Sequence, residues 1–190
     1  HLATEWIEEE NLMEQIKFLG PLRLPEAKKI MEQLIDTLDF MHKQGIIHRK
    51  IHPKNLYLTK QGLKIADFGI AIHFDMVGLS VLSLYEEKED DIFFTAPEQI
   101  QDYRNIDNRS DIYSVGAVLF YLLTGKPLFD IVKQDPMYIV LDDKIKACQI
   151  SKFLPDIDIS IEKFILNCVE KNIKKRYQNI SEVKQNLLHI

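Results

Sequence analysis

The sequence has little cysteine and no long apolar run, and both shortages exclude classes of protein. Its two cysteines, Cys148 and Cys168, fit no metal-binding spacing and are too few for a disulfide-stapled domain. They are typical of reduced thiols in an intracellular protein. The longest apolar run, residues 115–123, is about half of the ~20 residues that span a bilayer. The first residues are not expected to form a signal peptide, and the presence of processing signals upstream of them stays open. We therefore expect an intracellular protein, cytoplasmic or cytoskeletal, without membrane insertion.

Positive charge is also in short supply. The 24 lysine and arginine residues are outnumbered by 29 aspartate and glutamate residues, which gives a formal net charge of -5. A general nucleic-acid binder needs a basic surface to neutralise phosphates, so nucleic acid is not an expected partner. Hydrophobic residues at 46% and charged residues at 28% are ordinary for a globular protein and exclude a largely disordered chain. The length of 190 residues predicts one domain, burying about 70% of its unfolded surface.

The spacing of apolar residues predicts a mainly α-helical domain. A short amphipathic helix is predicted at residues 12–19, and a long helix with one buried face at residues 25–44. Residues 108–123 begin with polar capping residues and then become apolar on every side. A helix that is apolar all round must be buried, so this segment is predicted to lie in the core.

Shorter elements complete the prediction. Residues 56–59 and 63–66 are two β runs joined by a turn, which predicts a hairpin. Two late helices are expected to be capped by Ser160 and Ser181. Residues 1–11 are predicted to form a short strand that runs into an acidic connection.

One stretch of the chain, residues 46–58, reads I-I-H-R-K-I-H-P-K-N-L-Y-L. It resembles the catalytic loop of protein kinases, H-R-D-x-x-x-x-N, whose aspartate holds the substrate hydroxyl and whose asparagine holds magnesium. Three residues match that motif: His48, Arg49 and Asn55. Lys50 stands in place of the catalytic aspartate. His52 stands where serine/threonine kinases have a lysine that helps to neutralise the transferring phosphate.

Four further motifs agree with this resemblance, in the order and at the spacings of protein kinases. They are D-F-G at residues 67–69, A-P-E at 96–98, D-I-Y-S-V-G at 111–116 and G-K-P-L-F at 125–129. The third has tyrosine where kinases have tryptophan. Five separated motifs that agree are far more specific than any one of them.

The resemblance implies a fold and its subdivision. The expected fold is mainly α: a protein-kinase-like large lobe with short β hairpins around the catalytic loop. The whole chain, residues 1–190, would be a partial kinase domain, with a hinge at 1–11, a large lobe at 12–190 and an activation segment at 67–98. The glycine-rich loop and strand lysine of a small lobe do not occur in the sequence.

The resemblance also assigns contacts for a nucleotide. Thr4 would be the gatekeeper, Glu5 and Ile7 would offer backbone groups to adenine, and Asn11 would lie near the ribose. From these residues alone, an N-terminal strand followed by an acidic helix start is the favoured alternative.

The metal ligands that the resemblance implies are Asn55 and Asp67, oxygen donors suited to magnesium. Structural roles are implied for a further set: His48, Arg49, Phe68, Gly69, Glu98, Asp111 and Arg176.

Three ion pairs are predicted. Lys50 is expected to pair with Asp67 or to hydrogen-bond Asn55 in place of the metal; the alternative is a surface lysine without a role. Arg49 is expected to bind the acidic run at residues 86–91 as a permanent latch.

The third expected ion pair joins Arg176 to Glu98, because a bidentate arginine can tie two segments together. The alternative is a solvated basic turn, which is the expectation for three neighbouring lysines: Lys171, Lys174 and Lys175.

The function predicted from these residues is a pseudokinase that acts as a protein-binding scaffold within a larger assembly, with no enzyme activity and no cofactor. Its partners would be other proteins, bound through the helices from Met137 onward. Residues 90–94, D-D-I-F-F, depart from the kinase G-T-x-x-Y pattern, which argues against peptide docking there. One alternative is a weak or unconventional serine/threonine kinase whose small lobe lies upstream, and another is an ATP-binding regulatory pseudokinase. ATP and magnesium are expected only if that lobe exists.

Overall fold

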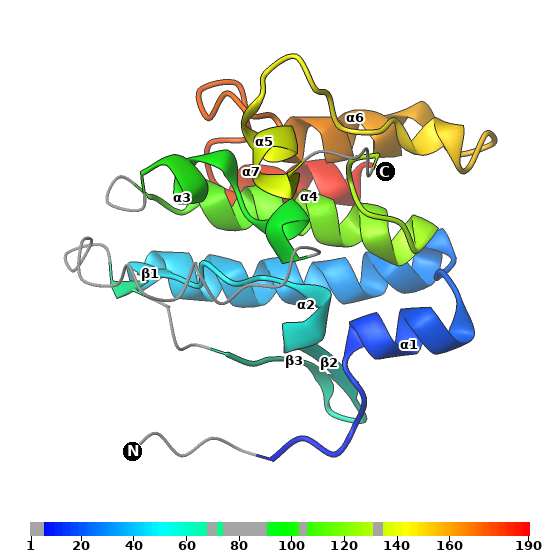
Figure 1. Cartoon of the computed structure of the whole chain (residues 1–190). Helices are drawn as coiled ribbons and strands as arrows, with labels where there is room; N and C mark the ends of the chain where they lie inside the picture. The colour runs from blue at the N-terminus through cyan, green and yellow to red at the C-terminus, as the bar shows by residue number, and fades with distance from the viewer. Residues whose placement is uncertain (1–5, 68–71, 74–90, 103–105, 131–134) are drawn as a thin grey trace.

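Two helices, α2 (Leu24–Lys43) and α4 (Arg109–Thr124), lie side by side at the centre of the structure (Figure 1). The computed structural model describes residues 6–67, 72–73, 91–102, 106–130 and 135–190. Two later helices, α6 (Ile159–Cys168) and α7 (Ile180–Leu188), pack on this centre: α6 lies against α4, and α7 against α2. Every residue of α4 from Ser110 to Leu123 is buried, which confirms the prediction of a core helix.

The close approach of α4 and α6 depends on one glycine. A Cβ atom added to Gly116 would lie 2.5 Å from the Cβ of Cys168 and 2.8 Å from a methyl carbon of Val169. Only a residue without a side chain lets the two helices approach this closely. The glycine of the D-I-Y-S-V-G motif is therefore a packing residue.

The remaining helices are short. They are α1 (Leu12–Leu19), α3 (Pro97–Gln101) and α5 (Pro136–Leu141), with 3-10 turns η1 (Pro53–Asn55), η5 (Asp91–Phe94) and η6 (Ile150–Lys152). The predicted bounds of α1 are confirmed. No helix in the described ranges is both long and apolar enough to cross a membrane.

Two small antiparallel sheets flank the catalytic loop. Strand β2 (Leu56–Thr59) pairs with β3 (Gly62–Ile65), and β1 (Ile46–Ile47) pairs with β4 (Ile72–His73). The predicted hairpin is confirmed, although its second strand begins one residue earlier than expected, because Gly62 pairs with Thr59. The prediction of a mainly α, kinase-like large lobe with short hairpins is confirmed.

The caps predicted for the last two helices are wrong. Asp158 caps α6 by accepting a hydrogen bond from the Ser160 amide (2.8 Å), and Asn179 caps α7 by accepting one from the Glu182 amide (2.9 Å). Both helices begin earlier than predicted, so Ser160 and Ser181 lie inside the first turn. Asp and Asn are as effective as Ser at this position, so residue type alone did not decide between neighbouring caps.

The N-terminal strand is not seen in the part of it that the structure describes. Residues 6–10 form no strand, and Asn11 makes a single β-bridge with Tyr57. The expected hinge residues Thr4 and Glu5 lie outside the described residues. The division of the chain into a hinge and a large lobe stays a prediction.

Candidate active site

A buried carboxylate holds the backbone of the catalytic loop. Asp111, at the start of α4, accepts hydrogen bonds from the amides of His48 (2.9 Å) and Arg49 (2.8 Å). Its Oδ2 also accepts a hydrogen bond from Nε2 of His42 (2.8 Å), on α2. Burial opposes ionisation of Asp111, but the bond and charge of His42, with the charge and amide of His48, hold its pKa below the usual range. The expected structural role of His48 and Asp111 therefore has a physical basis: a buried anion ties the loop to two helices.

The backbone adopts an uncommon conformation at two of the predicted residues, one in the catalytic loop and one after β3. Arg49 has φ of 68° and Asp67 has φ of 61°. Positive φ in a residue other than glycine is uncommon and occurs preferentially at functional sites. The carbonyl of Arg49 accepts a hydrogen bond from Nε2 of Gln99 (2.9 Å), which links the loop to α3. The predicted latch between Arg49 and residues 86–91 stays a prediction, because residues 86–90 lie outside the described residues.

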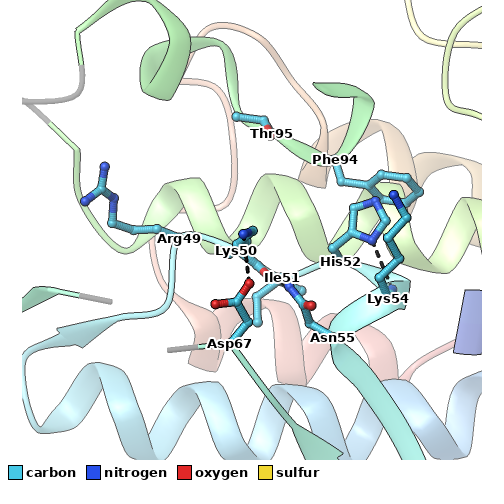
Figure 2. Close-up of a pocket in the computed structure, with 9 residues that line it drawn as sticks. All are labelled: Arg49, Lys50, Ile51, His52, Lys54, Asn55, Asp67, Phe94 and Thr95. Atoms are coloured by element: carbon cyan, nitrogen blue, oxygen red, sulfur yellow. Dashed lines mark hydrogen bonds and ion pairs between the residues drawn. The ribbon is translucent and has the colours of Figure 1, made fainter. Parts of the chain in front are cut away.

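A cavity of about 200 Å³ lies at the catalytic loop. We call it the loop pocket, and Figure 2 shows the nine residues that line it: Arg49, Lys50, Ile51, His52, Lys54, Asn55, Asp67, Phe94 and Thr95. Among these lining residues three are permanent cations and one is an acid. The loop pocket thus brings together four predicted site residues: Lys50, His52, Asn55 and Asp67.

Lys50 lies beside Asp67, as predicted from the sequence. Its Nζ lies 2.8 Å from Oδ2 of Asp67, which confirms the predicted ion pair (Figure 2). The two side chains are 31% and 40% exposed, so the pair faces the loop pocket rather than the core. Asn55 Nδ2 donates to the backbone carbonyl of Lys50 (2.9 Å), not to its ammonium. The two predicted metal ligands therefore both contact Lys50.

His52, at the position of the kinase lysine, packs its ring within the catalytic loop. It is buried, its ring packs edge-on against Phe94 with ring centroids 4.3 Å apart, and its Nδ1 accepts a hydrogen bond from the amide of Lys54 (3.0 Å). This bond caps the 3-10 turn η1, which carries Asn55. His52 therefore shapes the loop.

The remaining predicted nucleotide contacts are only partly described. Asn11 caps α1: its Oδ1 accepts a hydrogen bond from the amide of Glu14 (3.0 Å), and its Nδ2 donates to a carboxylate oxygen of the same residue (2.9 Å). Ile7 is half-buried, while Phe68 and Gly69 lie outside the described residues. A ribose contact by Asn11 and an adenine contact by Ile7 stay predictions.

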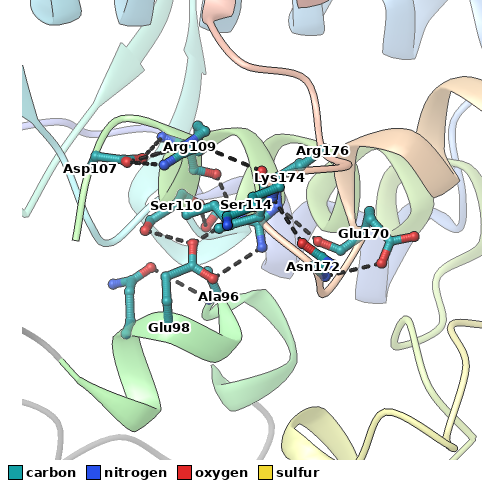
Figure 3. Close-up of polar contacts among 12 residues, drawn as sticks. Ala96, Glu98, Asp107, Arg109, Ser110, Ser114, Glu170, Asn172, Lys174 and Arg176 are labelled. Carbon is teal, nitrogen blue, oxygen red and sulfur yellow. Dashed lines mark hydrogen bonds and ion pairs between the residues drawn. The ribbon is translucent and has the colours of Figure 1, made fainter. Parts of the chain in front are cut away.

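A second polar cluster anchors the A-P-E segment (Figure 3). Arg176 Nη1 and Nη2 donate to the two carboxylate oxygens of Glu98 (2.6 and 3.0 Å), which confirms the predicted ion pair. Arg176 also donates to the carbonyls of Arg109 (2.7 Å) and Glu170 (2.9 Å), and Ser110 Oγ donates to Glu98 (2.9 Å). The A-P-E helix α3 is thereby joined to α4 and to the turn after α6.

One neighbouring lysine does not behave as predicted. Nζ of Lys171 is half-buried and donates to the carbonyls of Ile139 (2.9 Å) and Asp142 (2.8 Å). It also lies 4.9 Å from the centroid of the Phe129 ring. The expectation of a solvated Lys171 is wrong, because the last turn of α5 and the residue after it bring backbone carbonyls to this ammonium.

Sequence reasoning missed four residues that shape the site: His42, Lys54, Gln99 and Ser110. Lys54 could have been predicted from the sequence, because a count of the charged residues in the loop motif includes it, next to Asn55. Each of the other three makes a hydrogen bond to a residue 12 to 69 positions away in the sequence, so no local sequence pattern indicated its role.

Comparison with known proteins identifies the family. A family model for the protein kinase domain matches residues 1–188. This chain belongs to the protein kinase family. The kinase motifs at the loop pocket and around Glu98 are thus family features, and Lys50 is a departure from the catalytic motif within it.

Several curated relatives are bacterial kinases. A probable serine/threonine-protein kinase of Clostridium acetobutylicum is 32% identical over 195 positions, which cover 100% of this chain and 28% of the relative. Serine/threonine-protein kinase PknB of Mycolicibacterium smegmatis is 29% identical over 195 positions, which cover 100% of this chain and 30% of that relative. Serine/threonine-protein kinase PrkC of Bacillus subtilis is 30% identical over 193 positions, which cover 98% of this chain and 28% of that relative. The chain spans less than a third of the length of these relatives.

These relatives correct one prediction. They are named as serine/threonine-protein kinases, and the prediction of a module with no enzyme activity is wrong. That prediction gave Lys50 too much weight. A positioned general base contributes roughly 10²- to 10⁴-fold to a rate, whereas phosphoryl transfer depends mainly on positioning and charge stabilisation. Loss of one residue is therefore insufficient to exclude an enzyme.

Protein kinases use ATP and magnesium, so the expectation of no cofactor is not confirmed. The oxygen atoms of Asn55 and Asp67 have the chemistry that magnesium prefers. The ammonium of Lys50, however, lies 2.8 Å from the Asp67 carboxylate. At ~4 Å and an effective dielectric near 20, each unit-charge pair is worth about 4 kcal/mol, so the Lys50 ammonium offsets about as much as the Asp67 carboxylate would contribute to holding a divalent ion. With Lys50 in this position, the residues present do not fit magnesium.

Proposed function

We propose that this chain is the large lobe of a serine/threonine protein kinase of reduced rate, which transfers the terminal phosphoryl group of ATP to a protein hydroxyl. The observation that carries the proposal is the anchored catalytic loop, in which Asp111 binds the amides of both His48 and Arg49. Relatives named as serine/threonine kinases support the same reaction class. The nucleotide-covering lobe would lie upstream of these residues.

The proposed reaction forms a bond between the substrate oxygen and the terminal phosphorus of ATP and breaks the bond from that phosphorus to ADP. Its transition state is loose, so little covalent chemistry falls to the protein. The hydroxyl proton passes to a phosphate oxygen or to solvent, because Lys50 in its charged form accepts no proton. This route lacks a positioned base, which predicts a rate roughly 10²- to 10⁴-fold below that of an enzyme with one.

Lys50 contributes a charge to this reaction. In serine/threonine kinases, a lysine at the position of His52 helps to neutralise the transferring phosphate. Here His52 packs on Phe94, while the ammonium of Lys50 faces the loop pocket. Lys50 would therefore supply the positive charge from a neighbouring position of the same loop.

The proposed substrates and partners are proteins. The net charge of -5 supports this choice over nucleic acid. A scaffolding role beside catalysis would use the surface from Met137 onward.

Phosphoryl transfer from ATP by the full-length protein tests the proposal. The unchanged protein should label a serine- and threonine-containing substrate slowly, and Lys50→Asp should raise the rate by roughly 10²- to 10⁴-fold by restoring the base. Lys60→Asp makes the same charge change at an exposed position in the β2–β3 turn and should leave the rate unchanged. If neither the unchanged protein nor Lys50→Asp transfers phosphate, the proposal is wrong.

A further inference from the structure

We propose that the loop pocket binds the phosphate groups of a nucleotide without a divalent cation, with the ammonium of Lys50 in the place of the metal. The inference rests on the proposed function, because it states how that same site takes its nucleotide. It differs from the usual cation requirement of protein kinases and follows from the position of one side chain.

The first observation is the position of the Lys50 charge. Its Nζ lies 2.8 Å from Oδ2 of Asp67, the carboxylate that the kinase motif assigns to magnesium. An ammonium has three N–H donors in a compact head, so it can hold a carboxylate oxygen and a phosphate oxygen together. That is the bridging role that a metal ion fills between an aspartate and a phosphate chain.

The second observation is that the base of this side chain is held in place. Asn55 Nδ2 donates to the carbonyl of Lys50 (2.9 Å), and the amide of Lys50 donates to Nδ1 of the buried His48 (3.2 Å). Both peptide groups of Lys50 are thus tied to the loop. The same bond occupies the amide nitrogen of Asn55, so the second expected metal ligand also serves to position Lys50.

The third observation is the charge of the loop pocket. Three of its nine described lining residues carry a positive charge, Arg49, Lys50 and Lys54, and Asp67 is the single acid among these nine. The Lys50 ammonium already meets the Asp67 carboxylate, so a divalent ion would bring a second positive charge to that acid, whereas the phosphates of a nucleotide would bring negative charge to the ammonium. Electrostatic complementarity therefore favours an anion that arrives without its metal.

Nucleotide affinity measured with and without a divalent cation tests the inference. The full-length protein is titrated with ATP by isothermal calorimetry, once in excess EDTA and once in excess magnesium. The unchanged protein should bind ATP with dissociation constants that agree within about twofold, because a coupling factor near one means no linkage between the two ligands.

Variants separate the charge of Lys50 from other effects. Lys50→Asp should bind ATP weakly in EDTA and gain roughly 5- to 150-fold in affinity when magnesium is added, as expected for an ordinary coupled pair of ligands. Lys50→Met should also lose affinity in EDTA, because it removes the charge while keeping most of the side-chain length. Lys60→Asp should behave as the unchanged protein does, since it makes the same charge change in the exposed β2–β3 turn.

A direct readout of metal binding completes the test. Manganese titrated into the nucleotide-free protein, followed by electron paramagnetic resonance, should show binding to Lys50→Asp and none at matched concentration to the unchanged protein. Manganese binding at the loop pocket of the unchanged protein, or ATP binding that disappears in EDTA, would overturn the inference.

The outcomes distinguish this inference from the proposed function. Cation-dependent ATP binding together with phosphoryl transfer overturns the inference and leaves the proposed function standing. If the unchanged protein binds ATP independently of a cation, but neither it nor Lys50→Asp transfers a phosphoryl group, the proposed function is overturned and the inference stands. Absence of ATP binding under both conditions overturns both.

Discussion

Arg176 and Glu98 form a bidentate ion pair across 78 positions of sequence, with donor-to-acceptor distances of 2.6 and 3.0 Å. The side chain of Arg176 is 0% exposed and that of Glu98 is 15% exposed. Among the described residues, the guanidinium donates hydrogen bonds to the carboxylate of Glu98 and to the backbone carbonyls of Arg109 and Glu170. The pair therefore fixes α3, which carries the A-P-E glutamate, to the C-terminal half of the chain.

Arg176→Met should lower the free energy of unfolding by about 3–5 kcal/mol, because it leaves the Glu98 carboxylate buried without its cation. Arg176→Lys should cost less but still destabilise, since one ammonium cannot reproduce the planar fork. Urea denaturation measures both. Lys175→Met, at the exposed neighbouring position, is the control and should change stability by less than about 0.5 kcal/mol. A loss for Arg176→Met no larger than the control's would show that the pair contributes nothing.

Tyr113→Phe should be neutral or should stabilise the protein by up to about 1 kcal/mol. The hydroxyl of Tyr113 is buried and has no hydrogen-bond partner among the residues that the structure describes. Burial also raises the pKa of this hydroxyl, so the charged form plays no part at ordinary pH. Thermal unfolding of the two proteins measures the difference. Clear destabilisation by Tyr113→Phe would indicate that the hydroxyl has a partner, such as a buried water.

The comparison variant for this test is Tyr177→Phe. The Tyr177 hydroxyl accepts a hydrogen bond from Nδ2 of Asn167 at 3.5 Å. Removal of this hydroxyl should destabilise the protein slightly, so the stability changes caused by Tyr113→Phe and Tyr177→Phe are expected to differ in sign or in size.

Lys50→Met should change the free energy of unfolding by less than about 1 kcal/mol, because ion pairs at partly exposed positions contribute little. Lys152→Met is a matched control: its Nζ lies 2.9 Å from Asp130, and both of these side chains are more than half exposed. Chemical denaturation of both variants checks the expectation. A much larger loss for Lys50→Met would mean that the Lys50–Asp67 pair holds the loop together, and binding tests with that variant would then report folding rather than charge.

The stability of the fold should decrease as the pH falls below about 6.5. Burial lowers the pKa of His48 below its ordinary value of 6.5, so in this range the unfolded chain takes up a proton that the folded chain does not. Asp111, whose pKa is also lowered, acts in the same direction below its ordinary value of 3.8. Both groups therefore contribute stability that is present at neutral pH and is lost in acid.

Melting temperatures at about pH 7.5 and 5.5 check this expectation. His48→Asn, whose amide oxygen can accept the hydrogen bond from the amide of Lys50, should show a smaller fall between the two values. His189→Asn, at an exposed position after α7, should show the fall of the unchanged protein. Equal falls in all three proteins would mean that His48 is not the group responsible.

Helices with a strong apolar pattern could be predicted from the sequence. The buried face of α2 and the fully buried α4 follow from periodicity, because burial of apolar surface dominates the choice of core helix. The caps of α6 and α7 could not be predicted as well, since several neighbouring polar residues can cap equally and the helix start depends on packing.

Only part of the site could be predicted, because its residues are brought together by folding. The pairs Lys50–Asp67 and Glu98–Arg176 were predicted because a known motif supplied the three-dimensional neighbourhood that the sequence alone does not contain. His42, Gln99 and Ser110 belong to no part of the motif that was considered, and they were missed.

The sequence by itself determined the family, the mainly helical class and the charge change at Lys50, because motif order, apolar period and residue identity are properties of the chain alone. Only the tertiary structure decided what that charge contacts. Folding brings the loop after β1 against the residues that follow β3, so that the Lys50 ammonium meets Asp67 instead of solvent. The same folding turns His52 onto Phe94 and brings Arg49, Lys50, Lys54 and Asp67 to the lining of one pocket, since distances between remote side chains are set by packing and not by spacing along the chain.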